Sequence, residues 1–194
     1  MKSYMQLRSY LLCLLFVLPF GSALADEDAA KYSSALKTFQ DAGESGSFFG
    51  NSYGYALFPT IGKGGLGVGG AYGKGRVYAG GKWVGDTSMS QLSFGWQAGA
   101  QAYSQIIFFE DKRSFDEFTS GNFEFSADAS AVAITAGASA SAGSTGSAAG
   151  ASAGKRDATT AGAYRKGMAT FTVAKGGLMY EAVLAGQKFS YKAR

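Results

Sequence analysis

The sequence predicts an α+β domain. Its main element is a predominantly antiparallel, twisted β-sheet or a partly closed barrel-like sheet, with an N-terminal amphipathic helix and one short internal helix. Ten of the twenty residues from Gly62 to Gly81 are glycine, with apolar and aromatic residues between them, a pattern typical of close-packed β-segments and turns. Residues 91–103 alternate between apolar and small or polar side chains, as a half-buried strand does. Residues 29–39 carry apolar side chains at helical spacing.

The segment 1–25 has the features of a secretory signal peptide. The basic residues Lys2 and Arg8 precede an apolar run over 10–20, and Ala23-Leu24-Ala25 fits a small-x-small cleavage site. We therefore expect cleavage before Asp26 and export to the periplasm or the inner face of an outer membrane, or to the extracellular space. Cys13 is the single cysteine of the chain. The expected mature protein therefore depends on packing rather than on disulfides.

Residues 26–49 are expected to form the N-terminal helix and a linker, followed by one β-rich domain over 50–194. The apolar residues Ala29, Tyr32, Leu36 and Phe39 share one face of a helix over 28–42. This face is expected to pack on the domain core, and the alternative is a helix lying in a membrane surface. Residues 43–50 are expected to break the helix.

The glycine-rich half of the domain predicts several strands. Residues 52–58 form the first, which Pro59 is expected to end, and residues 65–72 and 76–79 form two more before a turn at Gly80-Gly81. Residues 91–103 are expected to form one long strand, bent at Gly95 or Gly99. A buried run over 104–109 continues it.

The second half predicts a short helix over 111–120, with Phe115 and Phe118 on one side, and a strand over 123–127. The segment 129–154 is a low-complexity tract made almost entirely of Ala, Ser and Gly, and it holds no charged side chain. Its part 131–135 could finish a strand. For the remainder, a strand pair of small residues, a loop and membrane helix packing through GxxxG all remain open. Strands are expected at 170–174, 178–184 and 188–192.

Composition excludes several classes of site. The chain has no histidine, and the expected mature chain has no cysteine, so His/Cys zinc sites and cysteine nucleophiles are excluded. Two GxGxxG matches begin at Gly62 and Gly65, but the residues after them cannot begin the helix that a dinucleotide site requires. We expect no catalytic residue, no metal site and no cofactor.

A hydrolase with paired carboxylates is the enzymatic alternative. Its candidate residues cluster on or near the short internal helix: Glu110, Asp111, Asp116 and Glu117. Their spacing favours solvation on the helix surface over catalysis.

Charge offers a further indication of function. The chain carries a formal net charge of +4, and the glycine-rich stretch holds only basic charges. Such clusters are either ordinary solvated lysines or a surface that attracts anionic lipid headgroups. Export argues against nucleic acid as a partner.

From Tyr53 onward the chain resembles the SYLF domain family, a lipid-binding module. The residues that carry the resemblance are Ala56-Leu57-Phe58-Pro59, Lys63, Gly67 to Gly75, Phe94 to Gln101, Ile106 to Phe109, Lys175 to Leu178 and Leu184-Ala185-Gly186. They are distributed over nearly all of the expected mature chain, and the ordered combination is more specific than any one motif.

The resemblance implies binding to anionic phospholipids through basic residues and the N-terminal helix. The lipid-binding candidates are Lys63, Lys74 and Arg76, with Lys82 added on charge alone. The leading hypothesis is an exported, non-enzymatic domain that binds an anionic phospholipid membrane surface peripherally, with protein partners unidentified.

Insertion of aromatic residues would add to this binding; Phe48, Phe49 and Tyr53 are the candidates. Two alternatives remain open. One is an integral outer-membrane β-barrel, and the other is a structural or self-assembling envelope protein.

Overall fold

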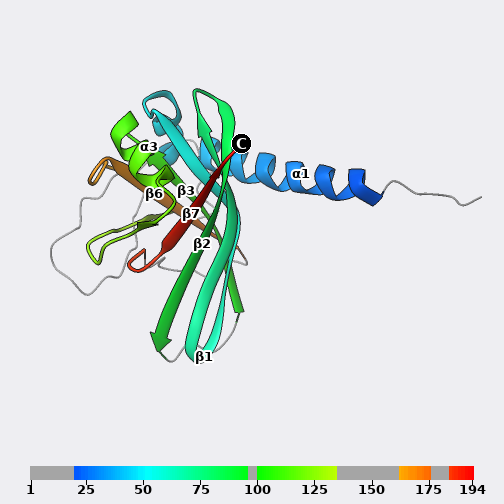
Figure 1. The fold of residues 1–194 in the computed structure, drawn as a ribbon, viewed down its shortest axis with the longest axis vertical. Coiled ribbons are helices and arrows are strands. Elements are labelled where there is room, and N and C mark those ends of the chain that lie inside the picture. Colours follow the sequence, from blue (N-terminus) through cyan, green and yellow to red (C-terminus); the bar gives the residue numbers. More distant parts are fainter. Residues whose placement is uncertain (1–19, 96–99, 135–161, 176–183) are drawn as a thin grey trace, which may run out of the picture.

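The structure is a computed structural model that describes residues 20–95, 100–134, 162–175 and 184–194 of the chain. Within these residues, seven strands form one sheet in the order β4-β7-β2-β1-β3-β6-β5, which curls into a half-barrel (Figure 1). All its strand pairs are antiparallel except β5 and β6. The predicted α+β fold with a mainly antiparallel, partly closed sheet is confirmed.

The elements are α1 (Phe20–Asp41), α2 (Gly43–Gly46), a 3-10 turn η1 (Ser47–Gly50), β1 (Gly54–Ala79), β2 (Lys82–Gly95), β3 (Ala100–Phe109), α3 (Lys112–Thr119), β4 (Phe123–Glu124), β5 (Val132–Ile134), β6 (Met168–Lys175) and β7 (Lys188–Ala193). The turn between β1 and β2 contains Gly80 and Gly81, both with positive φ, as the sequence predicts.

The long strand β1 turns back on itself near Gly65. A Cβ added at Gly65, whose φ is +154°, would collide with the backbone of Gly69, and one added at Gly73 would lie 2.6 Å from Ile61 Cγ1. The first half of β1, residues 54–64, therefore lies beside its second half, residues 67–79. The first half pairs with β3 and the second with β2.

The two faces of the sheet are both packed in the body of the domain. The inner, concave face holds a core that includes Phe58, Ile61, Met89 and Phe189. The outer face holds a second cluster around Leu57, Ile106, Phe108 and Phe171. Burying each such side chain contributes about 1.5–3 kcal/mol, so the two clusters hold the sheet together without disulfides.

Helix α1 packs on the outer face of the sheet. Phe39 is fully buried there, Ala35 is nearly so, and Tyr32 and Leu36 are half-buried beside them. This confirms that the apolar face of the helix docks on the core. The helix begins at Phe20, earlier than expected, so the acids at 26–28 lie inside it, and its N-terminal part extends past the sheet (Figure 1).

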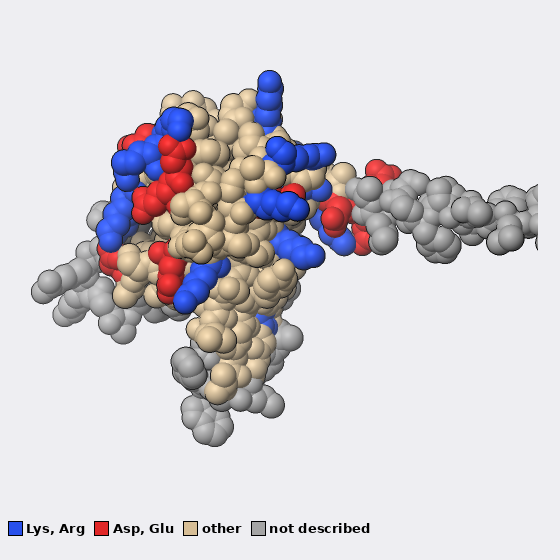
Figure 2. Space-filling view, in the orientation of Figure 1, with Lys and Arg blue, Asp and Glu red and all other residues tan. Residues whose placement is uncertain are grey.

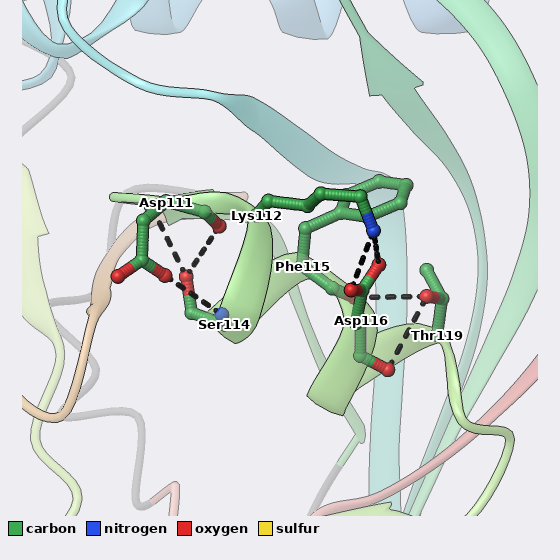
Figure 3. Close-up of polar contacts among 6 residues, drawn as sticks. All are labelled: Asp111, Lys112, Ser114, Phe115, Asp116 and Thr119. Atoms are coloured by element: carbon green, nitrogen blue, oxygen red, sulfur yellow. Dashed lines mark hydrogen bonds and ion pairs between the residues drawn. The ribbon is translucent and has the colours of Figure 1, made fainter.

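Helix α3 covers the inner face and confirms the predicted internal helix. Asp111 caps it, because its Oδ1 accepts a hydrogen bond of 2.8 Å from the Ser114 backbone while the Ser114 hydroxyl lies 3.3 Å from the Asp111 nitrogen (Figure 3). This cap lowers the pKa of the Asp111 carboxyl, mainly through the Ser114 backbone N–H. Lys112 pairs with Asp116 at 2.6 Å. Asp111 thus caps the helix, and Asp116 takes part in an ion pair on its surface.

Three strand predictions are wrong in an informative way. The segments 65–72 and 76–79 are not separate strands, because both belong to β1. Residues 91–103 do not form one strand, since they divide between β2, which ends at Gly95, and β3, which begins at Ala100. Pro59 does not end its strand. A register shift between Phe58 and Ile61 leaves Pro59 outside the ladder, where its missing N–H is not needed, and the Ser104 hydroxyl donates to its carbonyl at 2.7 Å.

The remaining predictions are confirmed in part. Strand β5 lies within the expected 131–135, β6 extends the expected 170–174 and β7 matches 188–192, whereas β4 is shorter than the expected 123–127. Residues 1–19 of the expected signal peptide, most of the Ala/Ser/Gly tract and most of the strand expected at 178–184 lie outside the described residues. Among the described helices, none is long and apolar enough to cross a membrane.

Candidate functional site

An open groove of about 610 Å³ crosses the outer face of the sheet beside α1. It is lined by residues of α1, both halves of β1, β2 and β7: Asp28, Lys31, Tyr32, Pro59, Thr60, Tyr72, Lys74, Gly75, Arg76, Trp83, Asp86, Thr87, Ser88, Ser190, Tyr191 and Lys192. Strand alternation explains why these polar side chains gather, because Tyr72, Lys74 and Arg76 alternate with the inward positions of Ala71, Gly73 and Gly75.

Arg76 lies at the centre of a stack of side chains. Its guanidinium carbon is 3.9 Å from the ring centroid of Tyr32 and 3.9 Å from that of Trp83. The guanidinium of Arg194 lies 3.8 Å from the Trp83 ring as well. The Arg76 guanidinium thus lies against two aromatic rings, and Asp86 is opposite Arg76 in the β1–β2 ladder. A planar guanidinium is the group that suits bidentate contact with a phosphate.

The lining carries an excess of positive charge. Its four cations are Lys31, Lys74, Arg76 and Lys192, against the two carboxylates Asp28 and Asp86. Lys31 is paired with Glu27 at 2.8 Å. Lys74 and Lys192 are exposed and make no ion pair with any residue that the structure describes.

A further lysine lies next to the groove. Lys175 donates a hydrogen bond of 2.7 Å to the Thr60 hydroxyl. Partial burial, followed by repulsion from Lys31, lowers the pKa of Lys175. An anion at this end of the groove would lessen the repulsion between Lys175 and Lys31.

Two rings of the groove are partly desolvated. Burial raises the pKa of Tyr32 to about 12, although the neighbouring Arg76 charge acts in the opposite direction. Burial also raises the pKa of Tyr191, whose hydroxyl donates to the Val84 carbonyl at 3.2 Å. Both tyrosines therefore remain neutral donors at physiological pH.

The structure brings two of the four predicted lipid-binding residues together. Lys74 and Arg76 line the groove. Lys82 is exposed at the start of β2, next to the Gly80-Gly81 turn and outside the lining. Lys63 is only 8% exposed and shares the inward parity of Ile61, so it lies on the opposite face of the sheet from Lys74. The fold therefore does not bring all four residues into a single site.

Sequence reasoning missed several lining residues, chiefly Lys31, Tyr32, Trp83 and Lys192. Lys192 had a readable signal, because Lys188, Ser190 and Lys192 alternate with Phe189 and Tyr191 in the last strand. Nothing in the sequence placed this strand beside β2, a pairing that depends on the whole sheet.

Figure 2 shows how charge is distributed on this side of the molecule. Lysine and arginine side chains gather beside the point where α1 leaves the body, whereas those on the α3 side are interleaved with acidic side chains. Among the described residues no cluster of three or more His, Cys, Asp or Glu side chains could hold a metal ion. Chemically, the arrangement can bind an anion between cations, hydroxyls and aromatic rings.

Comparisons with known proteins place this chain in a family. A relative from Aeromonas veronii, described as Beta cell expansion factor A, is 27% identical over 159 residues. The match covers 81% of this chain, and the chain spans about half the length of that relative (52%). The family model Ysc84, described as "Las17-binding protein actin regulator", matches residues 90–192. This range runs from β2 to β7, covers more than half of the chain and includes Ser190, Tyr191 and Lys192 of the groove. The chain therefore belongs to the Ysc84 family, the SYLF-domain family that its motifs resemble.

Proposed function

We propose that this protein is an exported, non-enzymatic domain that binds anionic phospholipid membranes peripherally, through the cationic groove on the outer face of its sheet. The observation that carries the proposal is the Arg76 guanidinium held between Tyr32 and Trp83, with Lys74 and Lys192 in the same groove. Each lysine or arginine near an anionic surface contributes about 1 kcal/mol of attraction. Three such groups suffice for salt-sensitive association.

The groove suits a phosphate headgroup more than a flat protein surface. The serine hydroxyls of Ser88 and Ser190, which lie 2.7 Å apart, stand on the same strand face as Lys192. Cations supply the charge, hydroxyls supply donors, and Arg76 supplies a fixed bidentate edge. Export, expected from the signal-peptide features of the segment 1–25, would place the domain beside the anionic lipids of a bacterial envelope.

The aromatic contribution proposed for Phe48 and Phe49 has no support in the fold. Phe48 packs at 5.1 Å from the Phe171 ring and Phe49 at 4.9 Å from the Phe108 ring, both within the outer-face cluster. Tyr53 is 41% exposed but lies against Phe115 of α3, away from the groove. Lipid contact by Phe48 or Phe49 would require that cluster to open.

The test is vesicle co-sedimentation with charge-matched variants. Lys74→Ala/Lys192→Ala removes two groove cations, and Lys112→Ala/Lys166→Ala removes two exposed lysines elsewhere, which pair with Asp116 and Asp128. The proposal predicts that only the groove variant loses binding to phosphatidylglycerol vesicles. Equal loss of vesicle binding in both variants would mean that net charge alone is responsible. Unchanged binding by both variants would show that the groove does not bind the membrane.

A further inference from the structure

The end of β1 and β2 carries almost no charge of its own, although Lys188 of β7, paired with Glu124, lies opposite Ser90 beside it. Residues 62–73 around the β1 turn and residues 88–95 at the end of β2, here called the tip, contain one charged residue, Lys63. Lys63 is only 8% exposed and lies on the inner face. Figure 2 shows the result: the part of the molecule that projects downward from the body is almost free of charged side chains.

The outer face of the tip presents large apolar side chains to solvent. Leu92 is 77% exposed, Val68 62% and Tyr72 54%, and these are three of the four exposed large hydrophobic residues in the described part of the chain. The pairs Gly70–Leu92 and Tyr72–Ser90 are opposite each other in the ladder. All three side chains are therefore on one face of the sheet.

This is the same face that carries the cationic groove, and Tyr72 belongs to both. Along the second half of β1, the outward positions run from Val68 through Tyr72 to Lys74 and Arg76. The order is thus apolar, aromatic with a hydroxyl, then cationic. A membrane presents the same order from its hydrocarbon through the interface, where tyrosine is favoured, to the phosphates.

The dimensions agree with this order. A strand rises about 3.3 Å per residue, so Leu92, opposite Gly70, lies about 13 Å beyond Lys74 along the sheet. The headgroup region of one leaflet is roughly 5–8 Å thick. With Lys74 at the phosphates, Leu92 and Val68 would reach the upper hydrocarbon even if the strand were tilted.

We infer that the tip is a membrane-inserting element, in which Val68, Tyr72 and Leu92 enter the acyl boundary of an anionic bilayer while the groove binds the phosphates. The inference rests on the proposed function and adds a hydrophobic component to it. Charge supports a bilayer over a second copy of the chain, since the apolar face is continuous with a cationic surface that would repel its own copy.

Insertion depth tests this directly. In a Cys13→Ser background, Leu92→Cys carries a nitroxide label, and Tyr53→Cys carries it at the far end of β1 as the control. Both proteins are used in the form to which an expressing bacterium processes them. On binding phosphatidylglycerol vesicles, the label at 92 should become accessible to oxygen and protected from a water-soluble nickel relaxant, while the label at 53 stays in water.

A second measurement uses changes that leave net charge intact. Val68→Ser/Leu92→Ser should weaken vesicle binding by about 10-fold or more, since burial of both side chains is lost. The salt concentration that releases the protein should fall as well. Tyr53→Ser, which alters an exposed aromatic residue elsewhere, should bind as the parent does. Because Val68 and Leu92 are exposed, the double variant should keep the parent's circular dichroism and melting temperature.

The outcomes separate the two proposals. If the parent binds anionic vesicles but the label at 92 stays in water, the insertion inference is overturned and groove binding stands. If the Ser variant changes the oligomeric state in solution and leaves vesicle binding intact, the tip is a contact between copies and the inference is overturned. If the parent binds no vesicle, both proposals fail together.

Discussion

The guanidinium carbon of Arg76 in β1 lies 3.9 Å from the ring centroid of Tyr32 in α1. One side chain therefore joins the N-terminal helix to the groove and is also the arginine that we propose contacts the anion. Any ligand that engages Arg76 acts on a residue already fixed by two rings, so little side-chain entropy is lost on binding.

Replacing Arg76 by Lys tests whether the planar edge matters. The variant keeps the charge but loses the stacking and the bidentate geometry. We expect binding to phosphatidylglycerol vesicles to fall by about 3- to 10-fold and stability by about 1 kcal/mol. Arg113→Lys, at an exposed arginine of α3 that pairs with Glu117, is the control. Unchanged vesicle binding by Arg76→Lys would show that Arg76 acts only as a point charge.

Tyr32 should hold α1 against the sheet. Tyr32→Ala removes a half-buried ring and its contact with Arg76, so we expect a loss of about 1–2 kcal/mol in the free energy of unfolding and faster proteolysis within α1. Tyr32→Phe keeps the ring and should be close to the parent in both measurements. Equal protease sensitivity of the Ala variant and the parent would show that Tyr32 does not anchor the helix.

Alkaline pH should destabilise the protein. The pKa values of Tyr32 and Tyr55 are both raised to about 12, mainly by burial. In the unfolded chain these groups lose their protons near 10.0, so the folded state holds protons that the unfolded state has released. Stability is intact below that value and declines as pH rises toward about 12.

Ultraviolet absorbance of tyrosinate during an alkaline titration measures this effect. The parent should show a late-titrating component coincident with unfolding, and Tyr32→Phe should reduce its amplitude. A titration of Tyr32 near 10 in the folded protein would contradict the burial that the structure shows.

Gly75 should be needed for the close approach of the two halves of β1. A Cβ there would lie 2.7 Å from Phe58 Cδ1 and 2.8 Å from the Leu57 carbonyl oxygen. Gly75→Ala should cost about 1–3 kcal/mol in the free energy of unfolding. Gly62→Ala is the control, because no atom lies within 4 Å of its added Cβ. Urea denaturation of both variants gives the comparison, and equal midpoints would refute the packing argument.

The sequence predicted the elements of this fold better than their pairing. The period of residues 29–39 identified α1, and Asp111 with the paired phenylalanines identified α3, because both signals are local. The division of 91–103 was missed because alternation is the same within one strand and across two. Which strand receives each half depends on β1, which lies between β2 and β3.

The residues of the candidate site were also predicted only in part, because some of them meet only through long-range packing. Lys74 and Arg76 were found because they are basic residues of the glycine-rich run that carries the family resemblance. Lys63 was chosen on the same ground, yet the turn and strand parity place it on the inner face. Tyr32 and Trp83 were not assigned to the site because they reach Arg76 only through the docking of α1 and the β1–β2 pairing.

The selectivity of the parent protein for anionic membranes is measured most directly through the salt dependence of its vesicle binding. Binding should be measured against vesicles of pure phosphatidylcholine and vesicles containing phosphatidylglycerol, each over a series of salt concentrations. We expect strong binding to the anionic vesicles at low salt, and weaker binding as added salt screens the charges of the groove. We expect little binding to the neutral vesicles at any salt concentration. Equal binding to both vesicle types, or none to either, would contradict this expectation.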